Sequence, residues 1–530
     1  MGKQRAVANC HRVGIRHVLA LTAALLFWAT PAVAQILFSI EQFEIIGENP
    51  LSAFDTDATL APFLGPQDGL SGVEDAAAAL EEAIKADGNY FHRVIVPPQQ
   101  AVAGVFRLEV LSFGLSSISV EGNEHFDEAN ILRSLPALDQ DSAPNSLAVA
   151  RALQLSNRHP SRRVAVFMRE AEAGSGLAAD VRVRDSRPYS VFGSIDNMGD
   201  EQSGVSRVSV GLQHTNLFNR DHGLTVSYTT SPESTGGVQQ MGAFYRAPLY
   251  RLSGELAAYY TESDVDTGRV GDAFDVSGAG RFVGLSYKHI LKPLGNYNHV
   301  AGISVDDRLF ENNTLFGGQP IGFDVRSRPL TFEYSGTIES GLERRNFYFQ
   351  YALNLGSGNH NTERAYVANR FGADPTWYTF RFGGDIRHPL PYGLSLRGQL
   401  RVQYSPDLLI SGEQFGVGGM HSVRGFEQRE LTGDKGMEAL VEVYTPPLKY
   451  NVQLLAFLDA GAVDVGSDDD TGVNGEVVAS FGLGLRWYWL NHVGVTFDAA
   501  YVFEGNSTQF AAENTRANTL DFHGSLFVRY

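Results

Sequence analysis

The residues with the clearest capacity for a chemical role are one arginine and one aspartate that stand among apolar residues and glycines. The glycine-dense segment 416–426 contains a single arginine, and it ends on Val423-Arg424-Gly425-Phe426. Asp459 lies between apolar residues, two positions after Phe457. A segment so rich in glycine can fold compactly and enter a cavity, where an unpaired charge is costly. The pattern therefore predicts that Asp459 and Phe457 are the partners of Arg424, and that the ion pair with Asp459 pins the segment in place.

No catalytic or metal-binding motif accompanies this pair. The sequence lacks a Gly-x-Ser-x-Gly nucleophile elbow, a His-Glu-x-x-His zinc site, and a glycine-rich loop ending in Lys-Ser or Lys-Thr that would hold nucleotide phosphates. Its 14 histidines are scattered. The run Asp468-Asp469-Asp470 lacks the ligand spacing of a calcium-binding EF-hand, so we interpret it as a solvated loop. We expect no enzyme activity, no cofactor and no metal.

The composition is acidic and moderately polar. The 530 residues include 42 Lys and Arg against 60 Asp and Glu, which gives a net charge of −18. This balance argues against a general nucleic-acid-binding protein, which would carry a basic face. A mean hydropathy of −0.14 argues against a helical membrane protein. The 56 glycines, 33 phenylalanines and 21 tyrosines suit many short strands, turns and aromatic girdles.

The first 34 residues have the pattern of an export signal. Basic residues occupy positions 3, 5, 12 and 16, an apolar stretch covers 18–28, and Ala32-Val33-Ala34 offers a cleavage site before Gln35. The apolar stretch is too short to span a bilayer as a helix, and no uncharged apolar run of 18 residues follows Gln35. Cleavage would remove Cys10, the only cysteine, which excludes disulfides and thiol catalysis. We expect residues 1–34 to be a signal peptide on a periplasmic, secreted or outer-membrane protein.

The segment that carries Arg424 lies within a long array of predicted strands. From residue 189 to 530 we find no convincing amphipathic helix, and segments of about ten residues with alternating polarity recur, for example 207–217, 346–355 and 394–404. Sixteen such segments can be counted. An even number of strands with a period of two residues predicts a transmembrane antiparallel β-barrel over residues 188–530.

The connections between these strands alternate in length. Those after even-numbered strands are short, such as 219–222 and 389–393, whereas those after odd-numbered strands are longer, such as 356–375 and 407–436. Outer-membrane barrels have short periplasmic turns and long outer loops. The alternation therefore places residues 37–187 in the periplasm. The longest connection, 407–436, carries Arg424, and we expect it to fold inward rather than to be exposed at the cell surface.

The last strand has two distinct faces. Phe522, Gly524, Leu526, Val528 and Tyr530 alternate with more polar residues along it. We expect this first set to face lipid, because a charged residue at mid-bilayer costs roughly 2–4 kcal/mol. The aromatic C-terminus on that face suggests an outer-membrane insertion signal formed by Phe522, Leu526, Val528 and Tyr530.

Two shorter α+β units precede the barrel. In the first, 35–115, a strand over 38–47 and a helix over 72–87 are followed by strands near 90–96 and 105–111. The second, 116–187, repeats this order: a strand over 118–120, helices over 128–134 and 146–158, and strands over 164–169 and 177–183. Two units of about the same size thus stand in tandem.

The sequence resembles a known family. Val423-Arg424-Gly425-Phe426 is similar to the signature of the barrel superfamily that assembles or exports proteins at outer membranes. The N-terminal units resemble POTRA domains, whose first strand ends in a Gly-Asn element, here Gly122-Asn123 and more loosely Gly47-Glu48-Asn49. Residues 157–162 resemble the second POTRA of two-partner secretion transporters. Two POTRAs before a 16-stranded barrel are the architecture of that family, the haemolysin secretion/activation (ShlB/FhaC/HecB) transporters.

The resemblance implies a transporter in the outer membrane with periplasmic POTRA domains. Such a protein exports an unfolded partner protein, the passenger, through its barrel by two-partner (type V) secretion and without ATP. In the superfamily the loop arginine folds inward and pairs with an aspartate, which corresponds to Asp459 here. The resemblance also implies a large, repeat-rich passenger that docks on the POTRAs, contact with outer-membrane lipid, and insertion by the barrel-assembly machinery. Many members begin with a pore-plugging helix, whereas here Ile36 leads directly into the first POTRA strand.

Three alternative functions were weighed. A barrel-assembly factor of the same superfamily typically carries three or more POTRAs. A porin-like channel would leave the tandem α+β units unexplained. An outer-membrane hydrolase would need one of the catalytic motifs that the sequence lacks. Export of a partner protein is therefore the preferred hypothesis.

Overall fold

The chain forms two compact units. The computed structural model describes residues 37–68, 70–100, 103–171, 176–200, 203–235, 238–264, 268–270, 274–276, 279–311, 315–316, 319–320, 323–464, 475–490, 492–507 and 515–530. The predicted signal peptide and the run Asp468-Asp469-Asp470 lie outside these residues. The first unit comprises the chain up to Ile46, Ser52–Leu80 and Val94–Glu109, and the second comprises Gly47–Leu51, Glu81–Arg93 and Val110–Tyr530.

The elements between residues 37 and 112 form the first α+β assembly. Strands β2 (Gln42–Gly47), β4 (His92–Ile95) and β5 (Val105–Ser112) form a sheet in the order β2-β5-β4. Strands β1 (Leu37–Ile40) and β3 (Gly65–Asp68) pair separately, so the strand predicted over 38–47 is divided at Glu41. The helices are α1 (Ala53–Leu60) and α2 (Ser71–Ala86). The apolar stripe of α2 is buried, as its period of 3.6 residues predicts: Val73, Ala76, Ala77, Leu80 and Ile84.

The elements between residues 115 and 185 repeat this plan. Strand β6 (Leu115–Glu121) pairs in parallel with β8 (Leu177–Asp185), and β7 (Arg162–Glu170) pairs with β8 in the antiparallel sense. Helices α3 (Glu128–Arg133) and α4 (Ser146–Ser156) are capped by Asp127 and Asn145, whose side chains accept backbone hydrogen bonds. After β6, Gly122 has a φ of 82°, and a β-carbon there would collide with the carbonyl of Val183. The glycine of the Gly-Asn element is therefore required by a close backbone contact.

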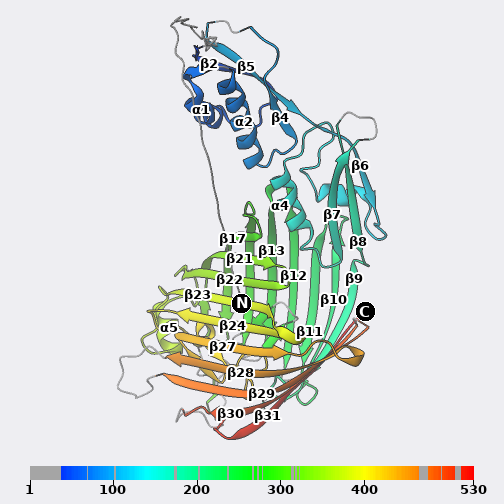
Figure 1. Cartoon of the computed structure of the whole chain (residues 1–530). Helices are drawn as coiled ribbons and strands as arrows, with labels where there is room; N and C mark the ends of the chain where they lie inside the picture. The colour runs from blue at the N-terminus through cyan, green and yellow to red at the C-terminus, as the bar shows by residue number, and fades with distance from the viewer. Residues whose placement is uncertain are drawn as a thin grey trace, which may run out of the picture. The chain divides into compact units, whose positions relative to one another are not determined.

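The remaining long strands close into a barrel (Figure 1). Each is antiparallel to its neighbours, and β31 pairs with β9 to close the ring. Segments β20 and β21 are successive parts of one strand opposite β17, so the barrel has 16 strands, as the sequence predicted. The strands are β9 (Tyr189–Asp196), β10 (Arg207–Leu217), β11 (His222–Thr230), β12 (Gln239–Leu249), β13 (Gly254–Ser263), β16 (Gly280–Ile290), β17 (Tyr297–Phe310), β20 (Val325–Ser327), β21 (Pro329–Ser340), β22 (Glu343–Asn354), β23 (Tyr378–Pro389), β24 (Ser395–Tyr404), β27 (Lys435–Tyr444), β28 (Val452–Asp464), β29 (Glu476–Trp489), β30 (Val493–Glu504) and β31 (Thr519–Arg529).

The period of two residues separates the two faces of the wall. On β31 the side chains of Phe522, Leu526, Val528 and Tyr530 are exposed, whereas that of His523 between them is buried. Similar rows of exposed apolar side chains follow the outer face of the other strands, such as Val210 on β10. An outer face of this kind suits lipid, and the polar residues turn to the lumen.

The connections alternate in length around the barrel. Those at one end are short turns, at 218–221, 250–253, 291–296, 341–342, 390–394, 445–451 and 490–492. Those at the other end are longer loops, at 197–206, 231–238, 264–279, 311–324, 355–377, 405–434, 465–475 and 505–518. Three of the longer loops contain short paired strands: β14 (Gly268–Val270) with β15 (Phe274–Val276), β18 (Leu315–Phe316) with β19 (Gln319–Pro320), and β25 (Phe415–Val417) with β26 (Leu431–Gly433).

Two details differ from the prediction for residues 189–530. Loop 355–377 contains helix α5 (Glu363–Asn369), capped by Thr362, where no helix was expected. A helix of two turns is too short to show an amphipathic period in sequence. Val325–Ser327, which lies outside the strand segments predicted from the sequence, is strand β20. No helix among the described residues is long and apolar enough to cross a membrane.

The closing strand yields a first prediction. The backbone N–H of Tyr530 donates to the carbonyl of Val191 on β9, and that of Val191 donates to the carbonyl of Tyr530, each at 2.9 Å. Deletion of Tyr530 removes this pair, and Val528→Asp places a charge on the lipid-facing side of the wall, where it is unfavourable. Both variants should lower the amount of heat-modifiable barrel in outer-membrane fractions.

Ser525→Asp is the matched control, because Ser525 lines the lumenal cavity on the opposite face of the same strand. It should insert like the wild type. Equal yields of the Val528→Asp and Ser525→Asp barrels would contradict the assignment of faces.

Candidate functional site

Loop 405–434 packs against the inner face of the barrel wall. Its buried apolar side chains meet those of three neighbouring strands: Val417, Val423, Phe426 and Leu431 on the loop, with Val463 on β28, Val478 on β29 and Val502 on β30. The wall residues point inward, because their neighbours, such as Val477 and Phe503, are exposed on the outer face. Burial of this apolar surface stabilises the loop inside the lumen.

The tip of the loop depends on one glycine. Gly425 has a φ of 90°, and a β-carbon there would lie 2.8 Å from Cγ2 of Val502 and 3.2 Å from Cβ of Ala500. Its backbone N–H donates to Nε2 of His523 on β31, at 2.8 Å. The backbone therefore approaches the wall as closely as a glycine allows.

Arg424 forms a bidentate ion pair with Asp459 on β28. Its Nε lies 2.6 Å from Oδ2 and its Nη2 lies 2.8 Å from Oδ1, and its backbone N–H also donates to Oδ2. The guanidinium carbon lies 3.6 Å from the centre of the Phe457 ring. Arg424 is 2% exposed and Asp459 is 0% exposed, so both charges have left bulk water. The structure thus brings together the arginine, the aspartate and the aromatic residue that the sequence singled out.

Two further carboxylates that the sequence reasoning missed complete this cluster. Nη1 of Arg424 lies 2.9 Å from Oε1 of Glu442 on β27 and 3.6 Å from Oδ2 of Asp498 on β30. Arg397 and Arg486 pair with these same carboxylates, at 3.2 Å and 2.7 Å. Cations and anions therefore alternate across the inner wall, and no member is left uncompensated. The alternation of Glu442 with the apolar Val441 and Val443 could have placed it inside, but not beside Arg424.

The tip has one more polar contact with the wall. The hydroxyl of Ser422 accepts a hydrogen bond from the backbone N–H of Gly418 and donates to Oε2 of Glu438 on β27. Arg401 on β24 pairs with the other oxygen of Glu438. The turn 418–422 is thereby held to the wall independently of Arg424.

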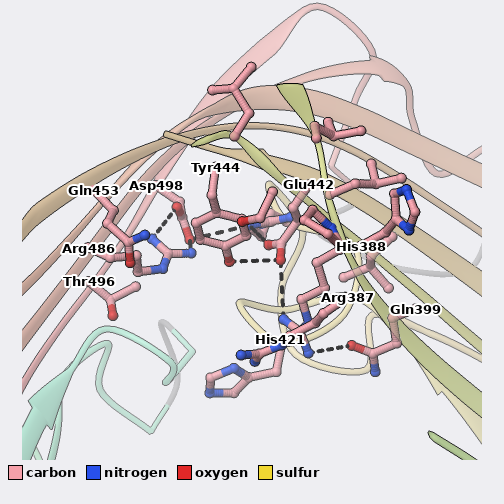
Figure 2. A pocket seen from close by; sticks show the side chains of 18 of the residues that line it. Arg387, His388, Gln399, His421, Glu442, Tyr444, Gln453, Arg486, Thr496 and Asp498 are labelled. Carbon is pink, nitrogen blue, oxygen red and sulfur yellow. Dashed lines mark hydrogen bonds and ion pairs between the residues drawn. The ribbon is translucent and has the colours of Figure 1, made fainter. Parts of the chain in front are cut away.

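A polar cavity of about 960 Å³ lies between the tip and the short-turn end of the barrel (Figure 2). Its lining runs from the short turns at Leu342 and Leu390 to Met420 and His421 on the tip. Along the wall it is lined by charged and amide side chains, including Gln399, Glu442, Gln453, Arg486 and Asp498. The loop tip thus lines the outer side of a polar space that begins at the short-turn end.

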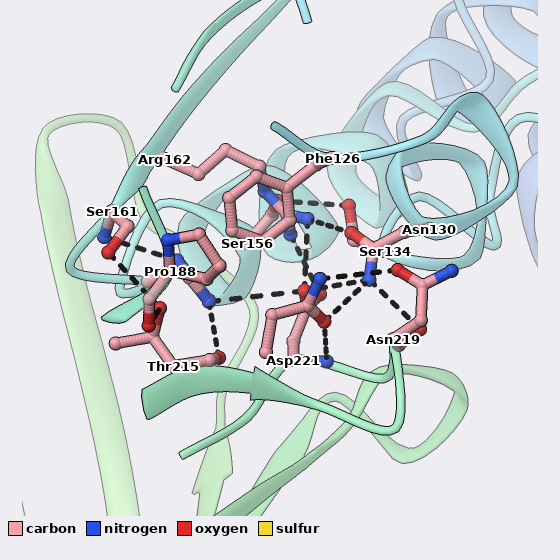
Figure 3. Close-up of polar contacts among 12 residues, drawn as sticks. Phe126, Asn130, Ser134, Ser156, Ser161, Arg162, Pro188, Thr215, Asn219 and Asp221 are labelled. Carbon is pink, nitrogen blue, oxygen red and sulfur yellow. Dashed lines mark hydrogen bonds and ion pairs between the residues drawn. The ribbon is translucent and has the colours of Figure 1, made fainter. Parts of the chain in front are cut away.

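The second α+β assembly contacts the short-turn end through a buried ion pair (Figure 3). Nη2 of Arg162, at the start of β7, lies 2.9 Å from Oδ2 of Asp221, which ends the turn between β10 and β11. Asn130 donates to Oδ1 of Asp221, at 2.9 Å, and the hydroxyl of Tyr250 donates to Oδ2. Arg162 and Asp221 are 0% and 1% exposed, so this pair is fully desolvated.

Residues 157–162, which resemble the second POTRA domain of two-partner secretion transporters, add further hydrogen bonds to this contact. His159 shares a hydrogen bond of 2.8 Å with the carbonyl of Thr215 through Nε2, and its Nδ1 accepts from the backbone N–H of Ser161. The Ser161 hydroxyl lies 3.1 Å from that of Thr215. Nε2 must therefore carry the proton, which makes His159 a neutral donor in this contact.

Among the described ranges of the chain, no group of three or more His, Cys, Asp or Glu side chains has the arrangement of a metal site. The ion pairs above are the chemistry that the site offers. They position a loop and a domain.

The His159 contact predicts a dependence on pH. Burial lowers the pKa of His159 from 6.5 to about 4, although Asp221 opposes this shift. An undocked histidine binds a proton at higher pH than the docked one, so docking should weaken as pH falls from about 6.5 to 4. The hydrogen-exchange protection factors of residues 156–164, which correct the measured rates for the pH dependence of intrinsic exchange, should therefore fall across this window in the full chain. His159→Gln keeps a donor for Thr215 without titrating, and an equal pH response in that variant would contradict the assignment.

Comparison with known proteins agrees with this architecture. The family model described as Haemolysin secretion/activation protein ShlB/FhaC/HecB matches residues 178–487, and a POTRA domain model of ShlB type matches residues 38–112. Outer membrane transporter CdiB-2 of Burkholderia pseudomallei is 23% identical over 434 residues, 76% of this chain and 69% of the relative. Outer membrane transporter CdiB of Dickeya dadantii is 20% identical over 476 residues, 86% of this chain and 81% of the relative.

A solved structure with this fold is CdiB from Escherichia coli. It superposes with a TM-score of 0.70 at 17% sequence identity, over 94% of this chain and 92% of that chain. The family model covers more than half of the chain, including most of the barrel. The chain belongs to the haemolysin secretion/activation (ShlB/FhaC/HecB) family, and it is an outer-membrane transporter that exports a partner protein by two-partner secretion.

Proposed function

We propose that the barrel lumen is the route of the passenger polypeptide and that loop 405–434 closes this route at rest. The observation that carries the proposal is the desolvated pair of Arg424 and Asp459, which ties the loop tip across the outer side of the polar cavity. An extended chain needs a hydrated path for its peptide groups, and the charged and amide side chains of the cavity supply one. The loop then has to leave before a polypeptide can pass.

We propose that the passenger docks on the α+β assemblies as an added strand. Strands β2 and β4 are the edges of the first sheet, and β6 and β7 are the edges of the second. An edge strand offers unpaired N–H and C=O groups to an extended segment, so it gives affinity with little demand on side chains. This mode suits a passenger that arrives unfolded. We further propose a large, repeat-rich passenger whose folding outside the cell biases transport outward, and insertion of the transporter itself by the barrel-assembly machinery.

The strength of the tip anchor follows from its burial. Removal of one partner from a buried pair costs roughly 3–5 kcal/mol. An exposed pair is worth only about 0–1 kcal/mol. Exposed fractions of 2% and 0% place Arg424 and Asp459 close to the buried case. The barrel itself should survive the loss of this pair, because its ladder of backbone hydrogen bonds is closed.

Arg424→Ala should open the barrel without lowering its abundance. In planar bilayers the purified full chain should spend at least about ten times longer in conducting states, since each 1.4 kcal/mol shifts such an equilibrium tenfold. Asp459→Ala should resemble it. Arg424→Lys should restore closure only partly, because lysine lacks the planar fork that binds both oxygens.

A double-mutant cycle checks whether the two residues act together. If they do, the Arg424→Ala/Asp459→Ala variant should differ little from either single variant. Strictly additive effects on the open fraction would mean that the residues do not form a functional pair. Wild-type conductance in Arg424→Ala would remove the loop tip from the closing mechanism.

The inward pose predicts a pattern of surface labelling. Ser422→Cys, at a side chain that is 5% exposed, should react poorly with a membrane-impermeant maleimide on intact cells. Glu363→Cys, on the exposed face of α5 in another long loop, is the matched positive control. Cys10→Ser in both variants removes the only natural thiol. Equal labelling of the two sites would contradict the inward pose.

A further inference from the structure

We infer that Glu413 is a positioning residue that holds the neck of loop 405–434 to a second wall of the barrel, independently of Arg424 at the tip. The neck is defined here as residues 409–413 together with Asp434, where the loop leaves and rejoins strands β24 and β27. The inference rests on the proposed role of the loop as the closing element. It adds a second anchor that neither sequence motif marks.

Glu413 is buried in a cage of donors. Its side chain is 0% exposed, and its two oxygens lie 3.1 and 3.0 Å from Nη1 of Arg308 on β17. The hydroxyl of Ser327 on β20 donates to Oε1 at 2.6 Å, and Nη2 of Arg381 on β23 lies 3.5 Å from Oε2. The backbone carbonyl of Glu413 accepts from Nε2 of Gln403, at 3.1 Å. The carboxylate of Glu413 thus joins three strands of the wall, and its backbone carbonyl joins a fourth, β24.

This wall is not the one that holds the tip. In the closed ring, β17 lies opposite β30, which contributes Asp498 to the Arg424 cluster. The polarity is also reversed. At the tip a loop cation meets wall carboxylates, whereas at the neck a loop carboxylate meets wall cations. The loop is therefore fastened across the lumen at two sites, and release of one does not by itself release the other.

The two ends of the neck are tied to each other by Arg370, which follows α5. Its Nη1 donates to the carbonyl of Leu409 at 2.6 Å and to Oδ1 of Asp434 at 2.5 Å, and its Nη2 donates to Oδ2 of Asp434 at 2.8 Å. The backbone N–H of Leu409 also donates to Asp434. A residue of loop 355–377 thus bridges the entry and the exit of loop 405–434.

An apolar cluster inside the outer end of the barrel supports the same contact. Leu409 and Ile410 of the neck are fully buried against side chains of α5, its loop and the wall: Tyr366, Trp377, Phe282 and Phe310. Loops 355–377 and 405–434 therefore share one core within the lumen. Displacement of the neck has to carry loop 355–377 with it or break this core.

The wall keeps its own partners when Glu413 loses its charge, so a variant there can be specific to the loop. Arg308 retains Asp306 at 2.8 Å, and Nε of Arg381 retains Gln403 at 2.8 Å. Glu413→Gln should release the neck and leave the barrel folded. The matched control is Glu333→Gln, a lumenal glutamate on β21 that pairs with Lys288 at 2.8 Å.

The experiment measures how accessible the neck is to a thiol reagent in the full chain. Every sample carries Cys10→Ser and Ile410→Cys. Ile410 is 0% exposed, so its thiol should react slowly with a small maleimide in the parent. Glu413→Gln should increase the labelling rate at least several-fold. Glu413→Asp should have an intermediate effect, because it keeps the charge on a shorter side chain. Glu333→Gln should have no effect on the labelling rate. Heat-modifiability checks that each barrel is folded. A parent-like rate in Glu413→Gln, or an equal increase in Glu333→Gln, would overturn the inference.

Bilayer conductance of the anchor variants, made without the Ile410→Cys substitution, separates this inference from the proposed function. Each of Glu413→Gln and Arg424→Ala leaves one anchor intact, so we expect the double variant to raise the open fraction by more than the product of the two single effects. A double variant equal to Arg424→Ala alone would overturn the second anchor. Faster labelling at position 410 with wild-type conductance in every variant would uphold the neck anchor and reject the loop as the closing element.

Discussion

The structure depends on one constraint, which is that no backbone N–H or C=O group can remain unpaired in the hydrocarbon core of a membrane. An open sheet of 16 strands would leave two such edges, and the pairing of β31 with β9 removes both. Closure has a price: the pleat forces every second side chain into the lumen. The strands must therefore carry lipid-compatible residues on one face and residues that tolerate a confined space on the other.

The charged lumen follows from that constraint. Side chains that cannot face lipid gather inside, where water is limited and charges interact more strongly than in bulk solvent. Charges of opposite sign alternate along the wall. The run consists of Arg397, Glu442, Arg424 of the loop, Asp498 and Arg486. Glu442 and Asp498 are each balanced by two arginines, and Arg424 is balanced by Asp459 as well as by these two carboxylates. A loop that contributes Arg424 to such a run gains a strong anchor. Its departure leaves Glu442 paired with Arg397 and Asp498 paired with Arg486, and it removes the ion-pair partner of Asp459.

This arrangement suits an element that must be held firmly and still be released. A purely apolar plug would gain its stability from burial alone and would resist replacement by a polar polypeptide. Loop 405–434 instead combines a small apolar contact with Val463, Val478 and Val502 with several ion pairs. Some wall partners of these ion pairs keep a second partner, as Arg308 does with Asp306 and Asp498 does with Arg486. At the short-turn end, Arg162 and Asp221 apply the same chemistry to hold the second α+β assembly. Shared partners lower the cost of each rearrangement.

Sequence alone determined the features that follow from local periodicity. The alternation of polarity predicted the strands, and the helical stripe of α2 predicted its buried face, because each pattern depends on residues close together in the chain. The alternation of connection lengths predicted which end of the barrel carries the short turns. The glycine-rich segment and the isolated charges of Arg424 and Asp459 were also visible, since a lone charge among apolar residues demands a partner. What the tertiary structure decided is which groups meet. Glu442 and Asp498 join Arg424, and Arg308, Ser327 and Arg381 surround Glu413. These groups meet only because closure of the sheet and the return of one loop into the lumen bring together residues up to 105 positions apart. Helix α5 and the Arg370 bridge were hidden for the same reason: their stability comes from the core that two loops share inside the barrel, and no local pattern records a contact made across the lumen.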